Sequence, residues 1–204
     1  MPKRSALISP WSRPVALSHS HYDHAGGLEA LCRINNHLEL FLHPDCLASR
    51  SNLLSKDHLL GICKAVHQTA GPTDIGDGIR LTGAIPRVTD FEDAGRSVVE
   101  DQALFFETLE GVVILVGCAH AGVVNTLHYV GQLNAGKPIH AVIGGMHLID
   151  ATKKRIGKTI EAFIQYDLKL ISAGHCTGES ACEAMAGELG DRFIPLSAGL
   201  VFEF

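Results

Sequence analysis

Four side chains that can bind a metal ion lie within six residues near the start of the chain: His19, His21, Asp23 and His24. They follow the apolar residues Val15–Leu17. In a strand that ends in a tight turn, residues two apart point the same way, so His19 and His21 can bind one ion together. Asp23 and His24 then face a neighbouring site. Imidazoles and carboxylates at this density suit zinc, manganese or iron, and core packing does not require them.

Three later apolar strands each end in a turn of small residues that contains a histidine. These histidines are His120, His147 and His175. In layered α/β proteins the ends of neighbouring strands share one edge of the sheet, where ligands bind. Glycines in these turns let the backbone approach an ion closely. We therefore expect residues distant in sequence to complete a two-metal centre with the first cluster.

The spacing of apolar residues predicts alternating strands and helices, and hence a layered α/β fold. The expected strands are 15–17, 38–42, 79–81, 103–106, 112–116, 139–143, 168–172, 193–196 and 200–204. The expected helices start at Leu28 or cover 57–67, 123–133, 156–164 and 182–189. A polar loop is expected over 88–96. We expect a single domain over 1–204, with 1–14 irregular.

Composition narrows the class of protein. The 204 residues are 46% hydrophobic, which predicts a compact globular chain, and the net charge of −5 comes without a long basic run. Nucleic acid is therefore not an expected partner. No stretch predicts a signal peptide or a membrane span. Six cysteines without paired CxxC spacing suit reduced thiols, so a cytoplasmic location and a small-molecule partner are expected, while the oligomeric state stays open.

These motifs together resemble the metallo-β-lactamase superfamily, whose HxHxDH motif is matched in full by His19 to His24. The segments GCAHAGVVNTL (117–127), GGMHL (144–148) and GHCTG (174–178) are similar to the subgroup named for dihydropterin-ribofuranosyl-aminobenzene-phosphate synthase. The resemblance extends from Val15 to the C-terminus. It implies a four-layer αββα sandwich with a dinuclear metal site at one edge of the paired sheets.

The resemblance also implies roles for individual residues. The first metal would be bound by His19 and His21, with His120 as the candidate third ligand. The second metal would be bound by the remaining three: Asp23, His24 and His175. Superfamily members commonly have a bridging aspartate where this chain has Cys118. Either Cys118 ligates as a thiolate or water alone bridges the ions.

Two further positions are expected near the substrate. His147 would support the ligands or face the substrate, and Arg87 is a weak candidate for contact with an anion. The segment 82–87 resembles a subgroup motif that usually has an acidic residue where this chain has Ala84.

The chain departs from the superfamily before HxHxDH, where members normally have several strands and about one strand's length is present here. We expect one sheet to lose part of its pairing and expose an edge. The chain is a fragment, has a mis-assigned start or is a shortened homologue.

The resemblance implies a metal-dependent hydrolase with two divalent ions, zinc above manganese or iron. A metal-bound hydroxide would attack a small anionic phosphate- or ester-like substrate, because zinc lowers the pKa of bound water to about 7. Asp23 would orient the nucleophile or move a proton. The alternatives are a non-catalytic metal-binding remnant of the fold and a pterin-related group-transfer enzyme.

Overall fold

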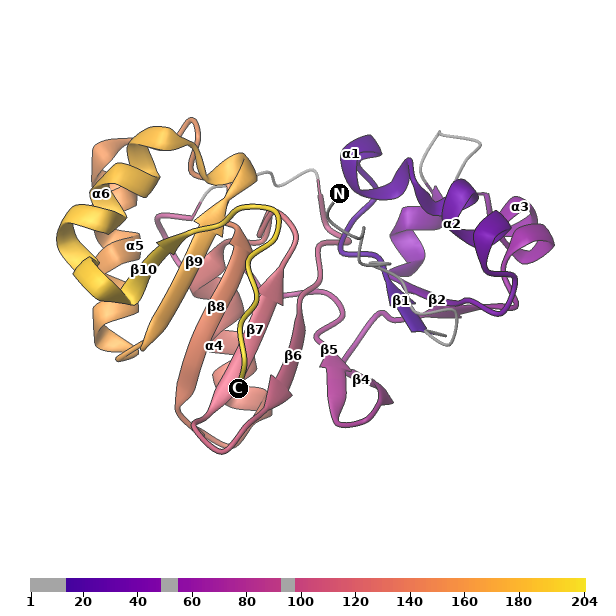
Figure 1. The fold of residues 1–204 in the computed structure, drawn as a ribbon, viewed down its shortest axis with the longest axis horizontal. Helices are drawn as coiled ribbons and strands as arrows, with labels where there is room; N and C mark the ends of the chain where they lie inside the picture. Colours follow the sequence, from indigo (N-terminus) through magenta and orange to yellow (C-terminus); the bar gives the residue numbers. More distant parts are fainter. Residues whose placement is uncertain (1–13, 49–54, 93–97) are drawn as a thin grey trace, which may run out of the picture.

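The computed structural model describes residues 14–48, 55–92 and 98–204. It contains a small sheet and a large sheet with helices on their outer sides, which is the layered αββα architecture expected (Figure 1). Most of the predicted irregular N-terminus and part of the polar loop 88–96 lie outside the described residues. In the part of the chain that is described, no helix has the length and apolar character needed to cross a membrane.

The small sheet has three parallel strands: β1 (Pro14–Ala16), β2 (Glu39–Leu42) and β3 (Ala65–Gln68). Its helices are α1 (Tyr22–Ala25), α2 (Leu28–Ile34) and α3 (Lys56–Ile62), and a 3₁₀ helix covers Pro44–Ala48. The apolar side chains of these elements form a core of their own, which includes Leu28, Leu40 and Leu59. This core fixes the segment that contains the HxHxDH motif.

The predicted helix over 57–67 is wrong after Ile62. Ser55 caps the start of α3 by accepting a hydrogen bond from the His58 amide, as its sequence suggests. The chain becomes extended at Cys63, and residues 65–68 pair with β2 as strand β3. Pairing with a buried neighbouring strand therefore overrides the local helical spacing.

The large sheet has seven strands in the order β10-β9-β8-β7-β6-β5-β4. Their bounds are β4 (Thr73–Gly76), β5 (Ile79–Leu81), β6 (Leu104–Glu107), β7 (Val112–Val116), β8 (Ile139–Gly145), β9 (Leu170–Gly174) and β10 (Phe193–Pro195). Strands β7 to β10 are parallel, whereas β4 to β7 are antiparallel. The carboxyl ends of β7, β8 and β9 therefore lie side by side, as predicted for the histidine-bearing turns.

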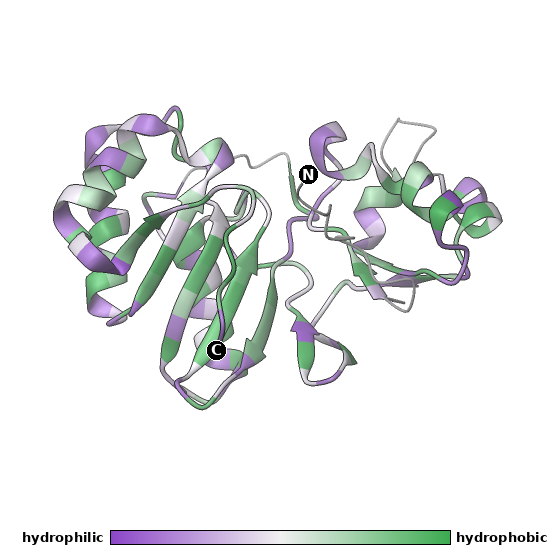
Figure 2. Ribbon diagram, viewed as in Figure 1, coloured by the Kyte–Doolittle hydropathy of each residue, from purple (hydrophilic) through white to green (hydrophobic). Residues whose placement is uncertain are grey.

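Three amphipathic helices pack on one face of this sheet: α4 (Val123–Leu133), α5 (Lys153–Gln165) and α6 (Glu179–Leu189). Their apolar sides meet buried strand residues such as Ile114, Val142 and Ile171 in the main core. Figure 2 shows these strands as predominantly hydrophobic, with hydrophilic residues on the outer sides of α5 and α6. All three helices agree with the predicted ranges to within a few residues.

The predicted strand over 200–204 is not formed. These residues have no strand partner in the described part of the chain, and they cross the face of the large sheet opposite α4 (Figure 1). Phe204 lies there with its ring centroid 6.2 Å from that of Phe106.

Candidate metal centre

The HxHxDH segment forms a short turn between β1 and α2. His19 is fully buried, whereas His21 and Asp23 are exposed and His24 is half-buried. The segment is extended up to His21, which precedes the first turn of α1, and the amide of His24 donates to the His21 carbonyl. This change of backbone direction lets alternate residues turn towards two adjacent places.

The turns after β7, β8 and β9 all contain a non-glycine residue in the left-handed region. The φ angles are +50° at Ala119, +47° at His147 and +53° at His175. Such a conformation costs on the order of 1 kcal/mol or more for a residue with a Cβ. Strained backbone in three adjacent turns is typical of a functional site, and here it lies next to the histidines.

The imidazoles from the two sheets form one cluster. The ring centroid of His19 lies 4.7 Å from that of His21 and 4.6 Å from that of His120. The His24 and His175 ring centroids are 5.3 Å apart, and the Asp23 carboxylate is 3.3 Å from His24 Nε2 and 3.2 Å from His175 Nε2. The structure thus brings together all six side chains predicted to bind metal.

Two sets of ligand atoms within this cluster each lie within 4.8 Å of one another. One set is His19, Cys118 and His120, and the other is His24, Cys118 and His175. The Cys118 Sγ atom belongs to both sets and lies 3.2 Å from His24 Nε2. The cluster is therefore arranged as two adjacent ligand sets with a sulfur atom between them.

Burial keeps the inner imidazoles neutral. It lowers the pKa of His19 to about 3 and that of His120 to about 4, with a further lowering from neighbouring imidazoles. Desolvation also lowers the pKa of His24 and of His147. A neutral imidazole has the free lone pair that a metal ion needs.

The residues present fit a divalent metal ion. Both ring nitrogens of the buried His120 have no hydrogen-bond partner among the described residues, which is costly for a polar group without a ligand. Imidazole nitrogens with a thiol and a carboxylate suit zinc or iron, whereas magnesium and calcium prefer oxygen ligands. The metal's number and identity stay predictions.

Comparisons with known proteins agree with this arrangement. No family model matches the chain. The 7,8-dihydropterin-6-methyl-4-(β-D-ribofuranosyl)-aminobenzene-5'-phosphate synthase of Methanocaldococcus jannaschii is 32% identical in an alignment that covers 93% of this chain and 74% of that protein. The crystal structure of a metal-dependent hydrolase of the β-lactamase superfamily matches with a TM-score of 0.78 and 26% identity over 93% of this chain and 78% of that one.

The chain belongs to the metallo-β-lactamase superfamily. A diphosphatase of the PhnP family also shares the fold, with a TM-score of 0.57 and 12% identity over 94% of this chain and 71% of that one. The recognition made from HxHxDH and the three later turns is therefore confirmed.

The remaining predicted site residues have different surroundings. The His147 ring centroid is 4.3 Å from that of His120, so His147 borders the candidate metal centre. Arg87 instead donates a hydrogen bond to the Val98 carbonyl at 2.5 Å and lies near the buried Asp101. The role of Arg87 in binding an anion stays a prediction.

Sequence reasoning missed the segment that joins the two sheets at this centre. Ser20 donates to the Glu100 carboxylate at 2.6 Å, and Asp101 accepts a hydrogen bond from the Ala121 amide at 2.8 Å. Gln102 donates to the Leu17 carbonyl at 2.8 Å. Residues 100–102 therefore connect the turn of HxHxDH to the turn after β7. Their one sequence signal is three polar residues directly before an apolar strand.

Cys176 was also missed. Its Sγ donates to the Cys118 carbonyl at 3.6 Å and accepts a hydrogen bond from the His147 amide at 3.3 Å. A Cβ at Gly145 would lie 2.7 Å from this sulfur and 2.6 Å from the Gly117 carbonyl, so only glycine fits there. The hydrogen bond between the two thiols raises the pKa of Cys118 and lowers that of Cys176.

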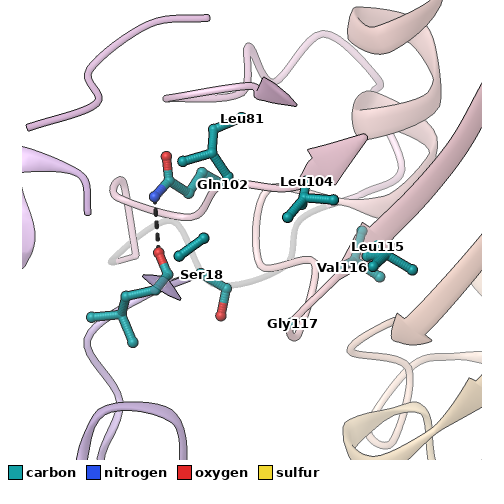
Figure 3. Close-up of a pocket in the computed structure, with 9 residues that line it drawn as sticks. Ser18, Leu81, Gln102, Leu104, Leu115, Val116 and Gly117 are labelled. Carbon is teal, nitrogen blue, oxygen red and sulfur yellow. Dashed lines mark hydrogen bonds between the residues drawn. The ribbon is translucent and has the colours of Figure 1, made fainter. Parts of the chain in front are cut away.

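An apolar pocket of about 210 Å³ lies beside the candidate metal centre (Figure 3). Leu81, Leu104 and Leu115 line it together with the backbone next to the ligand turns, at Ser18 and Gly117. None of the clustered imidazoles lines this pocket. The apolar pocket is therefore distinct from the metal centre, which is exposed to solvent at Asp23 and His175.

Proposed function

We propose that this protein is a metal-dependent hydrolase that acts on a small anionic phosphate- or ester-like molecule. The observation that supports this most directly is the pair of adjacent ligand sets, one buried around His19 and His120 and one more exposed around His24 and His175. A buried ligand set provides rigidity, and an exposed side provides access for a substrate.

In this proposal the first ion is bound by His19, His21 and His120. The second is bound by Asp23, His24 and His175. Divalent ions at such sites supply activated water at neutral pH and polarise a phosphoryl or carbonyl oxygen. Zinc suits the nitrogen-rich donor set, and manganese or iron are the alternatives.

Asp23 is the residue that we assign to proton handling. Slight desolvation acts to raise its pKa, but a backbone hydrogen bond and the nearby His24 and His175 outweigh it, so the pKa is lowered. The carboxylate is thus ionised at neutral pH. It is exposed beside the more open ligand set, where it can accept a hydrogen bond from a water molecule and orient it, or accept its proton.

The net charge of −5 does not itself attract an anion. In this proposal the attraction of an anionic substrate would depend on the positive charge of the bound metal ions. The same net charge argues against nucleic acid as a partner. The exposure of Asp23 and His175 would give a small molecule access to the centre from that side.

The test is hydrolysis of a panel of phosphodiesters, thioesters and lactones by metal-loaded protein. We expect His21→Ala to abolish the activity, because this proposal makes His21 a ligand of the first ion. His21 is exposed, so the substitution should spare the fold. His128→Ala is the matched control, since His128 is exposed on α4, away from the ligand turns. The hydrolase proposal fails if no activity in the panel is lost in His21→Ala.

A second candidate is group transfer on a pterin-related substrate. The 32% identity to the Methanocaldococcus jannaschii synthase favours it. The test is incubation of metal-loaded protein with an aminobenzene ribosyl phosphate and a reduced pterin whose 6-methyl carbon carries a phosphate-type leaving group. This reading predicts a product in which that carbon is joined to the aminobenzene nitrogen, with release of the leaving group, whereas the first proposal predicts only hydrolysis products. Bound metal with no turnover in either assay would indicate a metal-binding remnant of the fold.

A further inference from the structure

We propose that the thiolate of Cys118 binds both metal ions and bridges them. This inference rests on the two-metal centre of the proposed function, and it assigns the bridging ligand within that centre.

The first argument is position. Among the described residues, Cys118 Sγ is the one atom that belongs to both ligand sets, each of which has all its ligand atoms within 4.8 Å of one another. An atom shared in this way lies between the places where two ions would be bound. No carboxylate belongs to either set among the described residues, and Asp23 approaches only the side of His24 and His175.

The second argument is that the backbone fixes this sulfur. The Gly145 amide donates to the Gly117 carbonyl at 3.0 Å, and Cys176 donates to the carbonyl of Cys118 itself. A Cβ at Gly117 would lie 2.2 Å from the Ser18 hydroxyl, so the turn after β7 is pressed against the HxHxDH segment. Cys118 is 3% exposed. The sulfur therefore has a fixed place between the two sheets.

The third argument is chemical. A thiolate has several lone pairs and binds zinc, iron or cobalt strongly, and a thiol that coordinates a divalent ion loses its proton. In the absence of an ion, the thiol is within hydrogen-bond distance of His24 Nε2 at 3.2 Å. An ion that binds His24 would thus find the sulfur already beside it. Cys176 belongs to neither set, so we assign it the positioning of Cys118.

The test is a titration of reduced, metal-free protein with Co²⁺, followed by the thiolate-to-cobalt charge-transfer absorption in the near ultraviolet. A bridging thiolate predicts that this band grows with both the first and the second equivalent of cobalt. A band that follows only one of the two equivalents, or no band at all, overturns the bridge.

Two variants assign the sulfur. We expect Cys118→Ser to lose the band and Cys176→Ser to retain it, with unchanged circular dichroism spectra. Cys118→Asp should bind two cobalt ions without the band, because a carboxylate can also bridge, and it guards against a general loss of the fold. A band that persists in Cys118→Ser contradicts the proposal.

The cobalt readout is independent of turnover. A band that grows with both equivalents in protein that hydrolyses nothing would support the bridge and reject the hydrolase. Hydrolysis without any thiolate band would support the hydrolase and reject the bridge.

Discussion

The Gln102 side chain joins the two sheets, and its replacement by methionine tests that link. Gln102 is 2% exposed; its amide accepts from the Thr69 hydroxyl at 2.9 Å and donates to the Leu17 carbonyl at 2.8 Å. Methionine has nearly the same length and volume, so the substitution removes two hydrogen bonds without opening a large cavity.

The magnitude follows from the groups left behind. Thr69 and Leu17 are also buried, so the hydroxyl and the carbonyl would each lack a partner away from water. Each such group costs about 1–3 kcal/mol, so the two together give a loss of roughly 2–6 kcal/mol in the free energy of unfolding. That is a large part of the total of about 5–15 kcal/mol for a typical protein.

Urea denaturation followed by circular dichroism measures this loss. With a slope of about 2 kcal/mol per molar urea, the midpoint of Gln102→Met should fall by on the order of 1 M or more. Gln132→Met is the matched control, because Gln132 is exposed on α4 and its replacement should change stability by less than about 0.5 kcal/mol. Equal midpoints for Gln102→Met and the natural protein would refute the reasoning.

Two further predictions concern glycine and glutamate. Gly145→Ala should destabilise the protein by about 1–3 kcal/mol in urea and weaken cobalt binding, because its Cβ would clash with the Cys176 sulfur, whereas Gly157→Ala in α5, with open space around it, should stabilise by about 0.5–1 kcal/mol. Equal effects of both glycine variants would contradict this. Burial raises the pKa of Glu92 despite two backbone hydrogen bonds, so its contribution to stability is fully present below the unfolded-state pKa and is lost as pH rises through the folded-state pKa. The free energy of unfolding, measured over this pH range, should therefore fall less in Glu92→Gln than in the natural protein. Glu161→Gln is the control for charge, because Glu161 is exposed. Parallel curves for the Glu92 variant and the natural protein would rule the effect out.

Local patterns predicted most elements because apolar spacing is a local property of the chain. Helix α4 illustrates this with apolar residues at helical spacing, and strands β7 and β8 with short apolar runs; all three form where expected. The spacing of Leu59, Ile62 and Val66 continues a helical period past the end of α3, yet Val66 pairs with β2. Only the position of β2 in space decides between these two structures.

The candidate site shows the same division. His19 to His24 could be recognised because four ligand types occur in six consecutive residues. The partnership between Gln102 and Leu17 spans 85 positions, and that between Cys176 and Cys118 spans 58. Hydrogen bonds over such separations leave no periodic trace in a single sequence, so the segment 100–102 and Cys176 emerged only from the fold.

The described part of the chain has two hydrophobic cores, and the ligand side chains come from both. His19 and His24 extend from the core around the small sheet, whereas Cys118, His120 and His175 extend from the core around the large sheet. A cation bound by side chains from both cores would hold the two sheets together. At one hundred times its dissociation constant it would add about 2.7 kcal/mol to stability, and that energy would oppose the parting of the two halves, so chelation should speed amide hydrogen exchange along their boundary first.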